Sequence, residues 1–263
     1  MSPVLELEKF SGGHNGMKCV RDLSLHIDAG EVVSLLGPNG AGKTTTLLSV
    51  SGLLPVLGGE IRVVGQPVSG LRPHQIARRG VAHVPDDRGL IHSMTVAENL
   101  KLVGRGRDTG PVYEYFPALR QLSRRRCGLL SGGEQQMLAV GRALVTGPRL
   151  LIIDEMSLGL APVIVQRLLP TIRDIAKQDN VAVLLVEQHV ELALSVSDRA
   201  YVLVHGELVH EGPAATLGAE LHTIEASYLG KSAPHEGDAG AGLPNKAGNQ
   251  AEPDSSRFAP IKE

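Results

Sequence analysis

The chain has 263 residues, which corresponds to one large domain or two small ones at about 150 residues per domain. Its hydrophobic fraction of 42% and charged fraction of 21% suffice for a packed core, so the chain as a whole is not disordered. A net charge of −2 provides no overall basic field of the kind that binds nucleic acid. The one dense basic run, residues 124–126, is expected on a solvated helix face.

Cysteine usage and the first residues exclude further classes of protein. Cys19 and Cys127 lie far apart without metal-ligand spacing, which argues against a disulfide scaffold or a cysteine zinc site and favours a reducing compartment. Residues 2–8 contain acids where a signal peptide requires cations and an apolar stretch. Apolar runs such as residues 181–186 have strand length, well short of the ~20 residues that span a bilayer. We therefore expect neither secretion nor membrane insertion.

The first third of the chain predicts mainly β structure. Residues 4–10 and 20–27 alternate apolar and polar positions, which indicates antiparallel, half-buried strands. Residues 31–36 form a more continuous apolar run, as expected of a strand buried on both faces. A glycine-rich loop follows, and then a predicted helix over residues 43–51. Further short strands are predicted over residues 61–64 and 81–84.

The middle of the chain, residues 86–145, has a helical pattern. Thr95 and Glu98 have the spacing of a capping box, in which each residue satisfies a backbone amide of the other at a helix start. A second helix is predicted after residues 131–133, because apolar residues then recur at helical spacing.

The last part of the core returns to alternating strands and helices. Residues 150–153 and 181–186 have the composition of buried strands, and residues 162–177 predict the helix between them. Residues 201–204 and 207–209 predict a closing hairpin. The expected fold class is therefore α/β, with a mostly parallel sheet covered by helices. Residues 231–263 contain too few large apolar residues to fold, so they are expected to form a disordered tail.

A phosphate-binding pattern, G-x-x-x-x-G-K-[ST], lies between a predicted buried strand and a predicted helix, which is the context such a loop requires. Glycines allow backbone N–H groups to surround a phosphate, the helix start adds its positive dipole, and lysine adds a full charge. Thr44 supplies the hydroxyl that holds Mg²⁺. The pattern is formed by Gly37, Pro38, Asn39, Gly40, Ala41, Gly42, Lys43 and Thr44.

Two acids end the buried strand at residues 150–153, at the sheet edge where open α/β folds bind ligands. Asp154 is expected to support the Mg²⁺ shell, and Glu155 to orient and polarise the attacking water. Together with the phosphate loop upstream, the pair predicts hydrolysis of a nucleoside triphosphate.

The run Leu130-Ser-Gly-Gly-Glu-Gln-Gln136 lies between the phosphate loop and the acidic strand. It resembles the LSGGQ signature of ATP-binding cassette (ABC) ATPases, and the resemblance covers about residues 3–230. In that family the signature of one subunit closes over the nucleotide of the other, so that two chains enclose two ATP molecules. A helix start with free N–H groups suits this role as a second anion site. The residues so implied are Ser131, Gly132 and Gly133.

The resemblance is strongest to the ATPase subunits of branched-chain amino acid importers, the LivF type, through residues 94–100, 130–144, 157–162 and 185–188. It implies a P-loop NTPase cassette over residues 1–230, in which a mixed, mostly parallel sheet joins an antiparallel N-terminal β-subdomain and a helical subdomain inserted at about 86–146. ATP and Mg²⁺ are the implied cofactors, with Thr45 added to the nucleotide contacts.

The implied partners follow from the same resemblance. They are a second ABC ATPase subunit, identical or not, and transmembrane permease subunits that contact residues 87–102. A periplasmic or surface substrate-binding protein takes part indirectly, and nucleic acid takes no direct part. The expected location is the cytoplasmic face of the membrane, as a peripheral subunit.

Several positions depart from the general ABC pattern. Asp86 stands where most members have glutamine, and is retained as a candidate Mg²⁺ contact. Gln188 stands at the usual switch histidine; whether it or His189 reaches the γ-phosphate stays open, with His189 expected in helix packing. His14 stands at the adenine-stacking aromatic. Lys43, Glu155 and Gln188 are the candidate catalytic residues.

Three alternatives stay open at this stage. A urea or other amide importer ATPase has a similar sequence. A soluble ABC-type machine acting on nucleic acid or ribosomes usually has two cassettes or long coiled-coil insertions, and this sequence has neither. A regulatory ATP-binding subunit with little turnover is the third.

Overall fold

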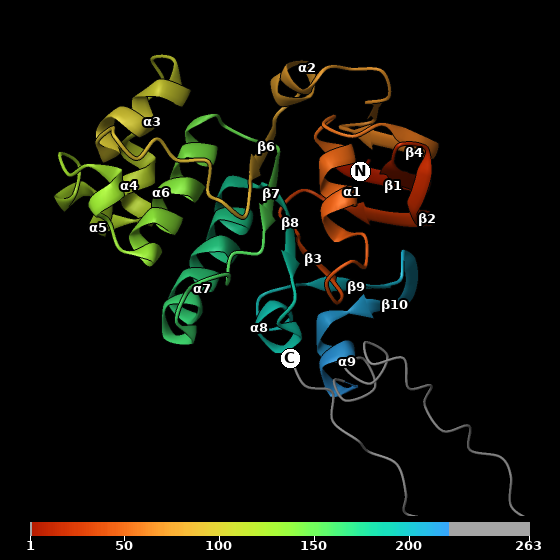
Figure 1. Cartoon of the computed structure of the whole chain (residues 1–263). Helices are drawn as coiled ribbons and strands as arrows, with labels where there is room; N and C mark the ends of the chain where they lie inside the picture. Colours follow the sequence, from red (N-terminus) through yellow and green to blue (C-terminus); the bar gives the residue numbers. More distant parts are fainter. Residues whose placement is uncertain (1, 221–263) are drawn as a thin grey trace, which may run out of the picture. The chain divides into compact units, whose positions relative to one another are not determined.

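The computed structural model describes residues 2–220, which all fall in one compact unit, Met1–Ser232. The prediction of a disordered tail over residues 231–263 lies outside the described residues. Two β-sheets with flanking helices make up the fold (Figure 1). This arrangement confirms the expected α/β class.

The larger sheet has six strands in the order β10-β9-β3-β8-β7-β6, all parallel except β10. Their bounds are β3 Val32–Leu36, β6 Val81–Val84, β7 Leu150–Asp154, β8 Ala182–Glu187, β9 Arg199–Val204 and β10 Glu207–Pro213. Strands β3, β8 and β7 are direct neighbours although far apart in sequence, so their carboxyl ends meet at one edge.

The smaller sheet is antiparallel, with the order β2-β1-β4-β5. Its strands are β1 Leu5–His14, β2 Met17–Ile27, β4 Val56–Val63 and β5 Gln66–Pro67. Strand β4 begins at Val56, earlier than the predicted residue 61, because an irregular register around Ser11 lets Gly58 and Val56 pair with β1. The antiparallel N-terminal sheet expected from the sequence is thus present.

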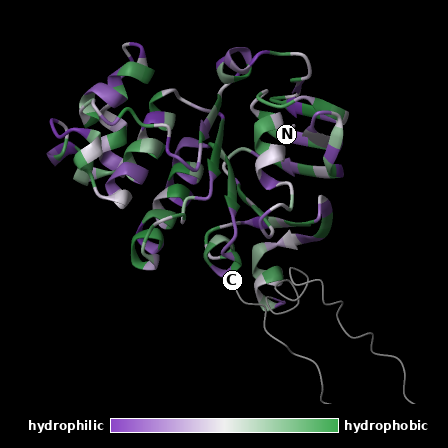
Figure 2. Ribbon diagram, viewed as in Figure 1, coloured by the Kyte–Doolittle hydropathy of each residue, from purple (hydrophilic) through white to green (hydrophobic). Residues whose placement is uncertain are grey.

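Both faces of the larger sheet are covered by apolar side chains. Along β3, Val33 and Leu35 pack into one core cluster together with the smaller sheet and α1 (Lys43–Val50). Val32 and Leu36 pack into the other cluster, which contains side chains of α6 (Gly132–Val145) and α7 (Pro162–Asp179). Figure 2 shows β7 and β8 coloured as hydrophobic along most of their length. Burial on both faces explains why these strands lack polar alternation.

The segment between β6 and β7 is helical, and Thr95 and Glu98 form the predicted capping box at its first helix. The basic run 124–126, however, lies in an exposed turn and bend rather than on a helix, because the chain there pairs with residue 95 in an isolated bridge. The helices here are α3 Val96–Gly104, α4 Gly110–Tyr115, α5 Pro117–Gln121, the 3₁₀ turn Cys127–Leu129 and α6.

The remaining helices are α2 Pro73–Arg78, α8 Val190–Leu194 and α9 Ala214–Ala219. Within residues 2–220, no helix has both the length and the apolar composition needed to cross a bilayer.

Candidate active site

The phosphate loop connects β3 to α1, as the sequence predicts. Gly37 has φ +153°, and a Cβ there would lie 2.2 Å from the carbonyl oxygen of Leu203. Gly42 caps α1 in the left-handed region at φ +102°, where a Cβ would lie 2.4 Å from Val20 Cγ2. Both positions therefore require glycine, for the backbone conformation and for the close approach of neighbouring strands.

Lys43 is buried at the start of α1, with 4% of its surface exposed. Its Nζ donates to the carbonyl oxygens of Gly37 at 2.8 Å and Pro38 at 3.1 Å. Burial lowers the pKa of the Lys43 amine, and the nearby carboxylates of Glu155 and Asp154 oppose that shift. The amine is thus held inside the loop by its own carbonyls, with acids beside it.

Asp154 ends β7 and is 5% exposed. Within the described part of the chain, its buried Oδ1 has no hydrogen-bond partner. Burial, followed by the charges of Glu155 and Asp86, raises the pKa of Asp154 to about 6, while Lys43 opposes the shift. A buried, unpaired carboxylate oxygen is costly unless a cation or donor satisfies it, so this atom fits a bound divalent cation.

Glu155 lies directly after β7, half-buried and with φ +45°. Its Oε1 accepts a hydrogen bond from Gln188 Nε2 at 2.8 Å and lies 3.9 Å from Lys43 Nζ. Neighbouring His189 is exposed as the residue before α8, so the expectation that it packs against helices is wrong. Its position is fixed by the chain turning into α8, which leaves the ring outside the core.

Asp86 follows β6 and is exposed, with its Oδ1 accepting from the amide of Asp87 at 2.9 Å. The negative charge of Asp86 repels that of Asp154 and so helps to raise the pKa of Asp154. Two residues later, Arg88 donates to Gln136 Oε1 at 3.0 Å and to Gln135 Oε1 at 3.1 Å. The loop after β6 is therefore attached to α6.

Ser131 is exposed and caps α6: its Oγ accepts from the amide of Glu134 at 3.4 Å, and Glu134 Oε2 accepts from the amide of Ser131 at 2.7 Å. A Cβ at Gly133 would lie 2.7 Å from Ile164 Cγ2, and one at Gly132 would lie 2.9 Å from a Leu160 methyl. The two glycines thus allow α6 to start close against the 160–164 segment of the same chain.

The structure brings the predicted site residues together in two groups. Lys43, Asp154, Glu155 and Gln188 converge at the carboxyl edge of β3, β7 and β8, and Thr44 is exposed beside them while Thr45 is buried. Ser131 forms a separate group, since within residues 2–220 no hydrogen bond or ion pair joins it to the phosphate loop. His14 is exposed at the end of β1, next to the hairpin.

Sequence reasoning missed three residues at this site: Arg88, Ser157 and Glu187. Glu187 is 1% exposed, and its two carboxylate oxygens accept from the amide of Ser157 at 2.9 Å and from its hydroxyl at 2.6 Å. The signal was present, because β8 ends at a glutamate that a glutamine follows, just as β7 ends at an aspartate that a glutamate follows. Only the parallel pairing of β7 with β8 shows that the two ends face each other.

The sequence matches the family model described as ABC transporter over residues 20–157. It is 41% identical to the high-affinity branched-chain amino acid transport ATP-binding protein BraG of Pseudomonas aeruginosa, over 86% of this chain and 100% of that protein. It is 34% identical to a probable branched-chain amino acid transport ATP-binding protein LivF of Archaeoglobus fulgidus, over 81% of this chain and 94% of that protein. The lipopolysaccharide export system ATP-binding protein LptB of Escherichia coli is 31% identical to this chain, over 87% of this chain and 98% of LptB.

Solved structures share the fold. The ADP conformation of MJ1267, an ATP-binding cassette of an ABC transporter, aligns with a TM-score of 0.77 at 23% identity, over 88% of this chain and 100% of that one. CbiO1 of Clostridium perfringens, part of the ABC transporter complex cbiONQ, also aligns with a TM-score of 0.77, at 20% identity over 87% of this chain and 96% of that one.

The fold and the phosphate loop define a nucleotide-binding ATPase, and the chain belongs to the ABC transporter family as an ATP-binding cassette. Members of the family are ATPases whose hydrolysis is coupled to transport, and they work with transmembrane permease partners. ATP is accordingly the ligand of this cassette.

Proposed function

We propose that the chain is the ATP-hydrolysing subunit of an importer for branched-chain amino acids and acts as an ATP-dependent dimer at the cytoplasmic face of the membrane. The observation that carries the catalytic part is the convergence of Lys43 and Gln188 on one oxygen of Glu155. The solute class is supported by BraG, which is matched over its whole length at 41% identity.

The roles of the residues follow from their positions. Lys43 and the backbone amides of the phosphate loop bind the phosphates of ATP, displacing the loop carbonyls that the amine contacts in this structure. Glu155 orients and polarises the attacking water, and Gln188 fixes the Glu155 carboxylate while reaching toward the γ-phosphate. Phosphoryl transfer requires mainly positioning and charge neutralisation, which this set of residues supplies.

Mg²⁺ fits the same residues. Thr44 is exposed and carries a hydroxyl, and within residues 2–220 the buried Oδ1 of Asp154 has no partner; both groups are hard oxygen donors of the kind that Mg²⁺ prefers. Asp86 lies near enough to influence Asp154 and is a further candidate contact. When bound there, the ion neutralises charge on the phosphate oxygens.

The dimer is supported by Ser131, which is exposed at the start of a 14-residue helix and lies apart from the phosphate loop of its own chain. A helix start attracts anions through its free amides and its dipole. We propose that Ser131, Gly132 and Gly133 close over the ATP that the second subunit binds, and that His14 stacks on the adenine.

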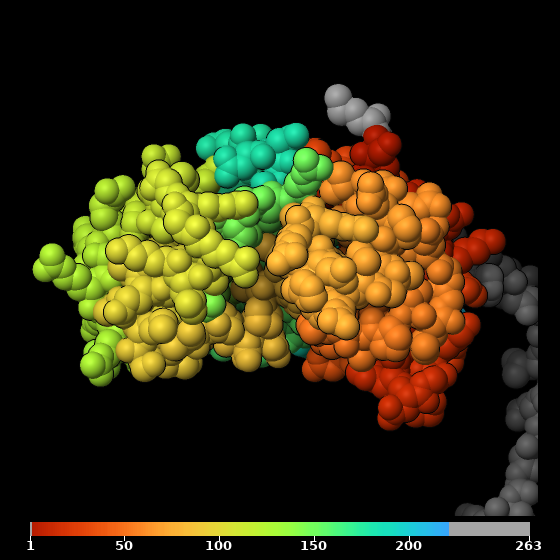
Figure 3. Space-filling model, turned by 90° about the horizontal axis from the view of Figure 1, so that it is seen from above, coloured from red at the N-terminus to blue at the C-terminus, as the bar shows by residue number. Residues whose placement is uncertain are grey.

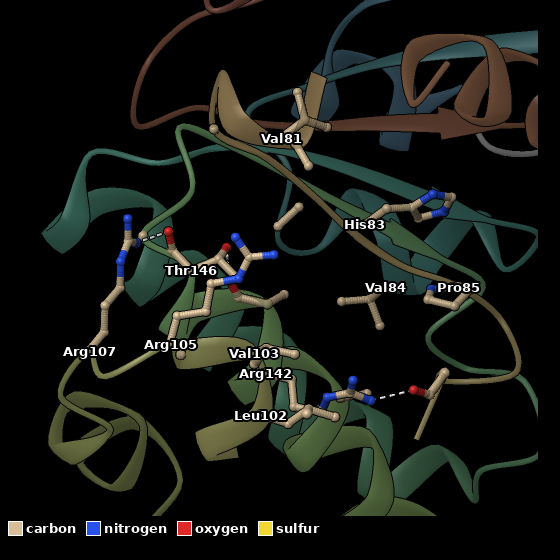
Figure 4. A pocket seen from close by; sticks show the side chains of 18 of the residues that line it. Val81, His83, Val84, Pro85, Leu102, Val103, Arg105, Arg107, Arg142 and Thr146 are labelled. Atoms are coloured by element: carbon tan, nitrogen blue, oxygen red, sulfur yellow. Dashed lines mark hydrogen bonds between the residues drawn. The ribbon is translucent and has the colours of Figure 1, made fainter. Parts of the chain in front are cut away.

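The contact with the permease is proposed at a cavity of about 760 Å³ between α2, β6, α3 and α6 (Figure 3). Five arginines line it and its lining includes no carboxylate, while Val84, Val103 and Leu102 add apolar surface (Figure 4). Among residues 2–220, Arg107 donates to the carbonyl of Thr146 and Arg142 to that of Gly89, and neither forms an ion pair. Charge complementarity therefore favours an acidic, partly apolar permease segment. The arginines are Arg78, Arg88, Arg105, Arg107 and Arg142.

Uptake of labelled leucine, isoleucine and valine tests the proposal in a strain that lacks this chain. Wild-type chain should restore uptake, Glu155→Gln should not, and the exposed-residue control Asp174→Asn should restore it fully. Normal uptake of all three solutes in the deletion strain would contradict the importer assignment. A defect in urea uptake or in lipopolysaccharide export would then identify the alternative.

A further inference from the structure

Glu187 is a buried carboxylate that the proposed chemistry does not use. It ends β8 with 1% of its surface exposed, and within residues 2–220 no lysine, arginine or histidine forms an ion pair with it. Both hydrogen bonds to its oxygens come from Ser157, at 2.9 Å from the amide and 2.6 Å from the hydroxyl. Burial raises the pKa of Glu187, and these two bonds oppose the shift. Because burying a carboxylate costs free energy, we expect Glu187 to have a role that offsets this cost.

Glu155, two residues before Ser157, has a strained backbone. Its φ of +45° lies in the left-handed region, which a glutamate adopts only when its surroundings impose it. Its amide donates to the carbonyl of Val186 at 3.0 Å, and its own carbonyl accepts from the amide of Leu158 at 3.0 Å. The strain thus sits in a short turn at the residue proposed to orient the attacking water.

Three consecutive residues at the end of β8 hold this turn. Val186 binds the backbone of Glu155, Glu187 binds Ser157, and Gln188 binds the Glu155 carboxylate. Each of the three side-chain bonds has a carboxylate acceptor and is therefore charge-assisted, a kind roughly twice as strong as neutral hydrogen bonds, and Glu187 accepts two of the three. Of the three residues, Glu187 therefore restrains the turn most strongly.

Packing holds the same turn on one side only, because Met156 is fully buried in the core whereas residues 157–159 border a cavity. Leu158 is 51% exposed, and the turn borders a cavity of about 220 Å³ that is also lined by Gln188 and His189. The carbonyl of Leu158 receives one further bond, from Arg88 Nη2, at the long distance of 3.5 Å. Without Glu187, the turn loses two of the bonds that restrain it, and the cavity leaves room for the Ser157 side to relax.

We propose that Glu187 is a positioning residue for hydrolysis: through Ser157 it keeps the backbone of Glu155 left-handed and its carboxylate aimed at the reaction centre. This inference rests on the proposed role of Glu155. Glu187 is a positioning residue rather than a catalytic one, because within residues 2–220 its hydrogen bonds go to Ser157 and none goes to Lys43, Asp154 or Glu155.

Steady-state ATP hydrolysis by the full-length chain tests this role. Glu187→Gln keeps the shape but removes the charge, and Ser157→Ala removes one of the two bonds. Each should lower kcat by about 10- to 100-fold, the range that a displacement of about 1 Å produces. The KM for ATP should stay within about twofold, since no phosphate contact changes. Ser157→Thr keeps the hydroxyl and should recover most of the rate, and the exposed control Glu191→Gln should have no effect.

Combining the variants separates positioning from general damage to the fold. In a Glu155→Gln background, Glu187→Gln should slow hydrolysis no further, because the group that it positions is already absent. An additional loss there, or a wild-type kcat in both Glu187→Gln and Ser157→Ala, would overturn the inference. If Glu155→Gln alone hydrolyses ATP normally, the proposed role of Glu155 is wrong, and that result is distinct from the others.

Discussion

The side-chain amide of Gln188 donates to the carboxylate of Glu155 over 2.8 Å, across the edge where β8 and β7 end. Lys43 Nζ lies 3.9 Å from the same carboxylate oxygen. One oxygen of Glu155 is thus held by an amide and faces an ammonium group, while the other has no hydrogen-bond partner within the described part of the chain.

Glu155→Gln should leave ATP binding intact and slow hydrolysis by about 10²–10⁴-fold, or ~2.7–5.4 kcal/mol of barrier, the usual contribution of a general base. The amide replaces the carboxylate in nearly the same volume, so the Gln188 bond to Oε1 is retained. Phosphate release checks the loss of hydrolysis, and nucleotide affinity measured on the same preparation checks that ATP binding is intact. Turnover within a factor of about two of wild type would remove Glu155 from this role.

Gln188→Ala should lower kcat by about tenfold, because the Glu155 carboxylate loses the donor that fixes its orientation. His189→Ala provides the comparison: that ring is exposed, and its removal should change kcat by less than about twofold. Single-turnover hydrolysis by the two variants compares them without interference from product release. A larger loss in His189→Ala would assign the γ-phosphate contact to the histidine.

Asp154→Asn should stabilise the protein in the absence of nucleotide and Mg²⁺. The pKa of Asp154 rises from 3.8 to about 6 on folding, so between these values the native state binds more protons than the unfolded state. The free energy of unfolding therefore falls as pH rises through this window, by up to ~3 kcal/mol. Asparagine removes this loss, so the gain in Tm should be largest above pH 6.

Thermal unfolding in EDTA at several pH values measures the effect. The advantage of Asp154→Asn should shrink as pH falls from 7 toward 5, since the native aspartate then becomes protonated. Asp174→Asn, on the exposed surface of α7, should show no such trend. A lower Tm for Asp154→Asn at pH 7.5 would show that desolvation does not dominate at this carboxylate.

Ser131→Arg should abolish most hydrolysis while each chain still binds ATP, because Ser131 is proposed to close over the nucleotide of the second subunit. Ser131→Asn is the matched control: asparagine also caps helices, so the helix loses at most a few tenths of a kcal/mol. Hydrolysis should be followed over a range of protein concentrations. Unchanged turnover of the arginine variant at low concentration would argue against a nucleotide enclosed by two chains.

Charge reversal at the cavity should uncouple the ATPase from the permease. Arg105→Glu combined with Arg107→Glu should leave hydrolysis by the isolated chain unchanged and reduce its stimulation by the permease about tenfold. Arg167→Glu changes the charge equally on the exposed surface of α7 and serves as the control. Normal stimulation of the double variant would place the permease contact elsewhere.

Much of the fold follows from local sequence. The strand at residues 32–36, the phosphate loop, the capping box at Thr95 and the helix start after residues 131–133 each depend on neighbouring residues, and the structure contains all of them. The early start of β4 was not predictable, because Gly58 and Gly59 favour a turn and only the irregular register against β1 makes them part of a strand.

The site likewise contains residues that local sequence predicts and contacts between distant parts of the chain that it does not predict. The identities of Lys43, Asp154 and Glu155 follow from motifs, whereas the bond from Ser157 to Glu187 spans 30 positions of sequence. It exists because β7 and β8 are adjacent, a pairing that no local pattern encodes. The left-handed backbone of Glu155 was equally hidden, since glutamate has no preference for that conformation.

The close approach of α6 to α7 has a practical consequence for interpreting mutants of residues 131–133 at the start of α6. A side chain at Gly133 would collide with Ile164, so a defective variant at this glycine reports disturbed helix packing as well as any damage to nucleotide contact. Ser131 is exposed and free of that ambiguity. Genetic screens of this chain should therefore weigh substitutions at the serine more heavily than those at the glycines when they test the proposed contact with a second subunit's nucleotide.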